Sequence, residues 1–125
     1  MLLKENLHPR IANDVWPAFL RGNYSMAVFQ AMKEVEVYAR EVAKLPPDLL
    51  GPDLMRKAFA VQSGPLTDPT AHKAEQQARS DLFAGAIGSY KNAHSHRHVY
   101  LSDPQEAIEI IMLANHLLRI IDGRK

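Results

Sequence analysis

The chain has 125 residues, 46% of them hydrophobic and 23% charged, so it can bury the core of one globular domain. A formal charge of +1 supplies no overall positive field, so any contact with nucleic acid must come from a local patch. With no cysteine, the sequence excludes a disulfide framework and thiolate zinc sites.

The first part of the chain predicts two helices. Residues 7–21 carry apolar side chains at helical spacing, although Pro17 should kink this helix or end it there. Residues 23–44 give the clearest pattern, with Asn23 as a cap and one continuous apolar stripe. That stripe consists of Tyr24, Ala27, Val28, Ala31, Val35, Tyr38, Val42 and Leu45.

Two charged residues of this second helix attract attention. Glu36 and Arg40 are four positions apart, in the order that favours an ion pair on a helix surface. They are interpreted either as a solvent-exposed ion pair on the helix surface or as a charge pair that reaches a functional site.

Turn-forming residues divide the middle of the chain. Pro46 and Pro47 end the second helix, and Gly51-Pro52 opens a short third helix that runs to about Val61. Residues 62–70 predict a loop, because glycine and proline occur there among small polar residues. Residues 71–88 predict another helix with a thin apolar face and a small-residue end.

The last helix begins at Asp103-Pro104, where Asp103 can cap and Glu106 stands at the capping-box distance. It is apolar on more than one side, which indicates a central core helix or one buried further by a partner chain. Its main stripe is Ala107, Ile110, Ile111, Ala114, Leu117, Leu118 and Ile121, widened by Ile108, Met112, Leu113 and Ile120.

These segments predict an all-α fold: a single-domain bundle of four to five helices spanning residues 1–125. No stretch is long and apolar enough to cross a bilayer, and the first residues do not read as a signal peptide. We therefore expect a soluble, cytoplasmic protein with no membrane partner.

Residues 89–98 concentrate the groups that can move protons or hold anions near neutral pH. Three histidines alternate with other residues in this stretch, together with Lys91, Asn92 and Arg97. An imidazole can act as acid or base, while the two cations can neutralise a phosphate. Such a set suits metal-independent cleavage of RNA by its own 2′-hydroxyl.

Two other interpretations of this stretch remain open. In an extended segment, His94, His96 and His98 would share one face and could hold zinc, nickel or copper. Alternatively, the stretch is a polar turn whose histidines cap helix ends or bond backbone groups.

The segment Tyr90-Lys91-Asn92-Ala93-His94-Ser95-His96 resembles the signature of the HEPN superfamily, whose commonest form reads R-N-x-x-x-H. Lys91 takes the arginine position, Asn92 the polar position and His96 the histidine position. Further likeness, over nearly the whole chain, is to the Ymh-like family of uncharacterised HEPN-type proteins. It rests on Leu7-His8-Pro9, Gly22-Asn23-Tyr24, Ala27 with Ala31, Glu36 with Arg40, Gly51-Pro52-Asp53-Leu54-Met55 and Phe83-Ala84-Gly85-Ala86.

The resemblance implies a helical homodimer that acts as an endoribonuclease without a metal or other cofactor, as in toxin–antitoxin and antiphage systems. By analogy, His96 would be the general acid or base, Lys91 would stabilise the phosphorane, and Asn92 would orient one or the other. RNA would be the substrate and a cognate antitoxin a further partner.

Other residues are expected to contact the substrate. Glu36 and Arg40 would border the cleft, and His94 and Arg97 are additional binding candidates beside His96.

One departure from the signature qualifies the expected activity. Lysine keeps the positive charge of arginine but lacks the planar fork that grips two phosphate oxygens. The sequence therefore leaves two functions open: a HEPN-type nuclease, or a non-catalytic module that binds RNA, a nucleotide or a protein partner.

Overall fold

The computed structural model describes residues 4–92 and 100–125. Within these ranges five α-helices follow one another: α1 (Pro9–Leu20), α2 (Tyr24–Ala43), α3 (Gly51–Ala58), α4 (Lys73–Ala86) and α6 (Pro104–Asp122). A 3-10 turn, η1 (Lys4–Asn6), precedes α1, and a π-helical segment, η2 (Ile87–Asn92), continues α4. The predicted single-domain, all-α bundle is confirmed, and the described ranges contain no strand.

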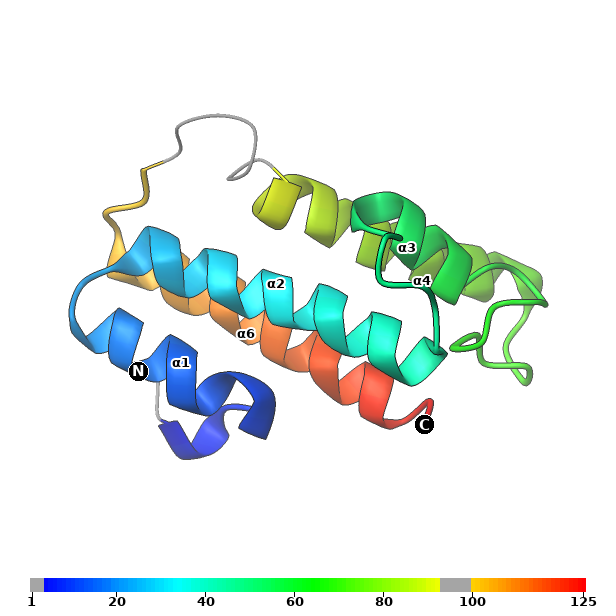
Figure 1. The fold of residues 1–125 in the computed structure, drawn as a ribbon, viewed down its shortest axis with the longest axis horizontal. Helices are drawn as coiled ribbons and strands as arrows, with labels where there is room; N and C mark the ends of the chain where they lie inside the picture. Colours follow the sequence, from blue (N-terminus) through cyan, green and yellow to red (C-terminus); the bar gives the residue numbers. More distant parts are fainter. Residues whose placement is uncertain (1–3, 93–99) are drawn as a thin grey trace.

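Helices α2 and α6 form the centre of the bundle. In Figure 1 they run side by side, with α1 along one flank and the α3–α4 pair along the other. The predicted main stripe of α6 is buried throughout, and the residues that widen it pack half-buried against the core. Much of the apolar surface of α6 is therefore covered within the chain itself.

The apolar stripe of α2 faces the same core. Ala27, Val28, Ala31 and Val35 are fully buried, and Tyr38 is nearly so. Burying such side chains stabilises the fold by roughly 25 cal/mol for each Å² of apolar surface removed from water. The three- and four-residue spacing read from the sequence thus identifies the inward face of α2 correctly.

The helix ends agree with the sequence only in part. Asp103 caps α6 as predicted, because its carboxylate accepts a hydrogen bond from the Gln105 amide at 3.0 Å. Asn23 stands at the N-cap of α2, but its side chain makes no capping hydrogen bond. Helix α1 continues through Pro17 to Leu20 rather than ending there. Asn13, four residues earlier, is exposed, so water can satisfy the carbonyl that loses its partner.

Among the described residues, none of the helices combines the length and the apolar character that crossing a bilayer requires.

Candidate functional site

The histidine-rich stretch, residues 89–98, begins within η2. Lys91 and the backbone of Asn92 belong to this π-helical segment. His94, His96 and Arg97, all predicted site residues, lie outside the described residues, as does the predicted metal face formed with His98. Of the three predicted catalytic side chains, only that of Lys91 is described.

The local structure explains where η2 lies. Ile87 is fully buried, which anchors the first residue of the segment in the core. At Gly88 a side-chain carbon would lie 3.5 Å from Pro52, so the backbone of η2 passes close to the start of α3. The close approach at Gly88 agrees with the clustering of small residues in the sequence, whereas an added side-chain carbon at Gly85 of α4 meets nothing within 4 Å. A π-helical turn is rare in proteins and occurs frequently at functional sites.

The structure joins Lys91 to one of the predicted residues of α2. The Lys91 ammonium lies 3.4 Å from the Glu36 carboxylate, and their side chains are 16% and 4% exposed. Two groups that the family resemblance assigned to one site are therefore neighbours. At this exposure the attraction between them is only partly screened by water.

Glu36 also binds the start of α3. Its second carboxylate oxygen accepts a hydrogen bond from the Gly51 amide at 2.7 Å. Gly51 is the first residue of α3 and has a φ of 62°, a left-handed conformation that glycine adopts without strain. The partial positive charge at a helix N-terminus favours a carboxylate there. One buried carboxylate thus connects α2, α3 and η2.

The predicted ion pair between Glu36 and Arg40 is not formed. Arg40 instead donates from Nη1 to the Leu49 carbonyl at 3.2 Å, while Glu36 binds Lys91 and Gly51. Spacing along one helix allowed the pair, but partners from other elements compete for both groups. Arg40 therefore holds the segment between α2 and α3.

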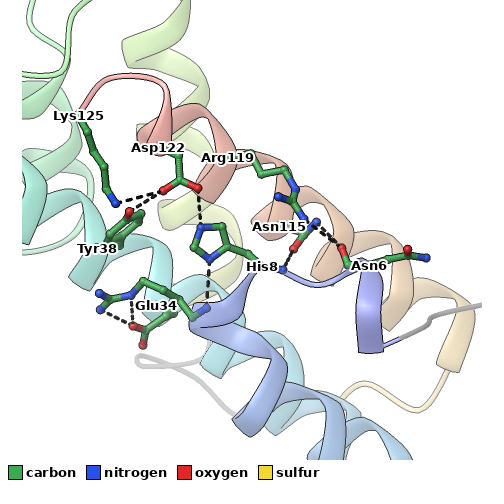
Figure 2. A network of polar contacts seen from close by, with 9 residues as sticks. Asn6, His8, Glu34, Tyr38, Asn115, Arg119, Asp122 and Lys125 are labelled. Atoms are coloured by element: carbon green, nitrogen blue, oxygen red, sulfur yellow. Dashed lines mark hydrogen bonds and ion pairs between the residues drawn. The ribbon is translucent and has the colours of Figure 1, made fainter.

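A second polar cluster, which the sequence reading missed, connects the two ends of the chain (Figure 2). His8, at the N-cap of α1, lies 2.8 Å through Nε2 from the Asp122 carboxylate at the end of α6. Tyr38 of α2 donates its hydroxyl hydrogen to the same carboxylate. The only local signal was the sequence His8-Pro9, which suits a helix start; nothing pointed to Asp122.

The hydrogen bonds of this cluster indicate the tautomer of His8 and affect the Asp122 carboxyl. The Arg10 amide donates to Nδ1 of His8 at 3.1 Å, so a neutral imidazole carries its hydrogen on Nε2 and donates it to Asp122. The pKa of the Asp122 carboxyl lies below its ordinary value, chiefly because the Tyr38 hydroxyl donates to it and also because His8 does. Because both ring nitrogens are engaged and His8 is buried, this histidine supports the fold rather than offering a free base.

Potential metal ligands do not gather in the described part of the chain. Residues 4–92 and 100–125 contain no group of three or more histidine, cysteine, aspartate or glutamate side chains suited to a metal ion.

Comparison with known proteins identifies a family but no characterised relative. A search of curated proteins and a search of solved structures each returned no match. A family model described as "Protein of unknown function (Hypoth_ymh)" matches residues 5–121. The match agrees with the resemblance to the Ymh-like family. The description of this family model does not mention the HEPN superfamily. Because it covers nearly the whole sequence, the chain belongs to the Hypoth_ymh family.

Proposed function

We propose that this protein is a metal-independent endoribonuclease of the HEPN type, with Lys91, Asn92 and His96 as its catalytic residues. The observation that carries the proposal is the contact between Lys91 and Glu36. It joins the first residue of the R/K-N-x-x-x-H motif to a residue of α2 that the resemblance placed at the same cleft.

The proposed reaction needs two proton transfers and one stabilised negative charge. The ribose 2′-oxygen attacks the neighbouring phosphorus, and the bond to the 5′-oxygen breaks, leaving a 2′,3′-cyclic phosphate and a 5′-hydroxyl. His96 takes the proton of the 2′-hydroxyl or returns one to the leaving 5′-oxygen. The Lys91 ammonium neutralises the charge that develops on the phosphorane, and Asn92 orients either group.

Glu36 supports this role of Lys91. A carboxylate 3.4 Å from the ammonium restricts the conformations of the long side chain. Arg40, one turn further along α2, supplies a second cation beside the proposed cleft, and His94 and Arg97 supply further phosphate contacts. The proposed division of labour is a buried acid that positions Lys91 and further cations that bind RNA.

The same contact also favours a second candidate function, a non-catalytic module that binds RNA, a nucleotide or a protein partner. Lys91 is paired with a buried carboxylate and is only 16% exposed, so part of its charge is already compensated. A lysine also lacks the fork with which arginine grips two phosphate oxygens.

The proposal includes a homodimer in the cytoplasm, with two copies of the motif facing each other, RNA as the substrate and a cognate antitoxin as a partner. Sedimentation velocity at micromolar concentration tests the dimer. We expect a mass near twice 14.0 kDa, and a single species at 14.0 kDa would contradict this part of the proposal.

RNA cleavage is tested with end-labelled RNA in EDTA. Wild-type protein is compared with His96→Ala and Lys91→Ala, and with His116→Ala as a matched control, since His116 is an exposed histidine of α6 that does not belong to the motif. We expect cleavage by wild type and control, and a loss of at least about 100-fold in the two motif variants.

The outcomes separate the candidates. Equal cleavage by wild type and His96→Ala would reject the nuclease and indicate a contaminating enzyme. Cleavage that EDTA alone abolishes would favour the metal interpretation of the histidines. An RNA mobility shift without cleavage would favour the binding module.

A further inference from the structure

A pocket of about 230 Å³ lies away from Lys91, the proposed catalytic residue whose side chain the structure describes. It is formed where the loop before α4, the first turns of α4 and the end of α6 meet. Lys91 follows the opposite end of α4, and a helix of that length spans about 20 Å. The pocket is therefore a separate feature of the fold.

The walls of the pocket are held by side chains that bind the loop. Gln76 is 6% exposed, donates to the carbonyls of Asp68 and Ala71, and accepts from the Gln62 amide. Arg124 donates from Nε and Nη2 to two further loop carbonyls. Because these bonds fix the loop against α4 and α6, the pocket exists without a ligand, as most small-molecule sites do.

The floor of the pocket is apolar. Phe59 and Leu66 are each 1% exposed, and Ile120 is half-buried beside them. An apolar cavity of roughly 150 Å³ holds a benzene ring, so this pocket has room for one ring or branched aliphatic group and a few polar atoms.

The rim carries charges of both signs. Glu75 and Arg79 stand one turn apart on α4, both exposed, and neither makes an ion pair or hydrogen bond with a described residue. Arg124 has donors on Nη1 beyond those that hold the loop. Asp68 is ionised, with its pKa lowered chiefly by hydrogen bonds from Thr70 and further by the charges of Arg124 and Arg79.

We propose that this pocket binds a zwitterionic α-amino acid with an aromatic or branched aliphatic side chain. Arg79 and Arg124 would hold the α-carboxylate, Asp68 and Glu75 would hold the α-ammonium, and the side chain would lie against Phe59. A simple anion would be repelled by the two carboxylates, and a simple cation by the two guanidinium groups. A ligand with both charges and an apolar part matches the whole lining, and this inference does not depend on the nuclease proposal.

Isothermal titration of the full chain with L-phenylalanine and L-leucine tests the inference. We expect at least one of them to bind with a dissociation constant of about 1 mM or tighter. Two analogues of phenylalanine serve as probes of the charges: 3-phenylpropanoate lacks the ammonium, and 2-phenylethylamine lacks the carboxylate. Each should bind at least tenfold more weakly, because it leaves rim charges unpaired.

Three variants locate the site. Arg79→Ala and Glu75→Gln remove a charge from the exposed rim, and Ala71→Leu fills part of the pocket. Each should weaken binding by at least tenfold, whereas Arg21→Ala, an exposed charge at the end of α1, should leave it unchanged. Circular dichroism of every variant verifies that the helices are retained.

Three results would overturn the inference. The first is the absence of binding heat with both amino acids at concentrations well above 1 mM. The second is equal affinity for phenylalanine and its two analogues, which would mean that the rim charges take no part. The third is unchanged binding in folded Arg79→Ala and Glu75→Gln.

Discussion

The imidazole Nε2 of His8 donates a hydrogen bond of 2.8 Å to the carboxylate of Asp122. The two residues are 114 positions apart in the sequence. The hydrogen bond connects the N-cap residue of α1 to the last residue of α6, and Tyr38 adds α2 to the same contact (Figure 2). His8 is 5% exposed whereas the Asp122 side chain is 39% exposed, so the contact closes the bundle at the edge of its core.

Removing this carboxylate should destabilise the fold. Asp122→Ala leaves the buried His8 ring and the Tyr38 hydroxyl without their acceptor. Because Asp122 is partly exposed, water can replace some of the loss, and we expect a decrease of about 2 kcal/mol in the free energy of unfolding. Urea denaturation measures the change. Asp14→Ala, an exposed aspartate of α1, is the control and should change stability by less than about 0.5 kcal/mol.

The contribution of Asp122 should depend on pH. Its pKa is lowered in the folded state, first by the Tyr38 hydroxyl and then by His8 and Lys125, while partial burial acts in the opposite direction. A carboxyl with a lowered folded pKa contributes its full stability above its unfolded pKa of about 3.9, and the contribution is lost as pH falls through the folded pKa. The difference in unfolding free energy between wild type and Asp122→Ala should therefore shrink below about pH 4.

Urea titrations from neutral pH down to about pH 3 measure this dependence. Asp14→Ala serves again as the control, because its free energy of unfolding should stay close to that of wild type at every pH. If the unfolding free energies of wild type and Asp122→Ala differed by the same amount at every pH, the assignment of the lowered pKa to these contacts would be contradicted.

The Glu36 carboxylate should be coupled energetically to Lys91. Glu36→Gln removes the charge of a residue that is 3% exposed, and Lys91→Met removes the ammonium 3.4 Å away. Each single change should cost about 1–3 kcal/mol, since it removes one charge of an ion pair that is largely shielded from water. The double variant should cost less than the sum of the two, by about 1–2 kcal/mol.

A double-mutant cycle by chemical denaturation gives this coupling free energy directly. Glu109→Gln, which changes an exposed glutamate of α6, replaces Glu36→Gln in the control cycle and should show no coupling to Lys91→Met. Strict additivity of the Glu36 and Lys91 changes would mean that the contact contributes nothing to folding.

Two glycine substitutions should change stability in opposite directions. At Gly64 a side-chain carbon would lie 2.4 Å from the Ala60 nitrogen and 2.4 Å from the Thr67 hydroxyl oxygen, so Gly64→Ala requires the loop to move. We expect a loss of about 3 kcal/mol. At Gly85, within α4, the added carbon meets nothing within 4 Å, and Gly85→Ala should stabilise the helix by about 0.5–1 kcal/mol.

Thermal denaturation of the two glycine variants beside wild type distinguishes these effects. A melting temperature that falls for Gly85→Ala, or stays unchanged for Gly64→Ala, would show that the surroundings of these glycines differ from those described.

Local patterns in the sequence were sufficient to predict the helices. The three- and four-residue spacing in α2 and α6 identified their buried faces, and Asp103-Pro104 identified the start of α6. These features depend on neighbours within a few positions, so a single sequence contains them. The proximity of Lys91 and Glu36 came from family resemblance rather than from spacing, and His94, His96 and Arg97 stay predictions.

Contacts between side chains that lie far apart in the sequence are determined only by the packing of the helices. Glu36 could have paired with Arg40 on its own helix, yet the docking of α3 and η2 brought Gly51 and Lys91 closer to its carboxylate. Likewise, nothing near His8 pointed to Asp122, because their contact depends on how α1 and α6 are placed together. A carboxylate or imidazole can satisfy its hydrogen bonds with many partners, and the tertiary arrangement selects which of them is near enough.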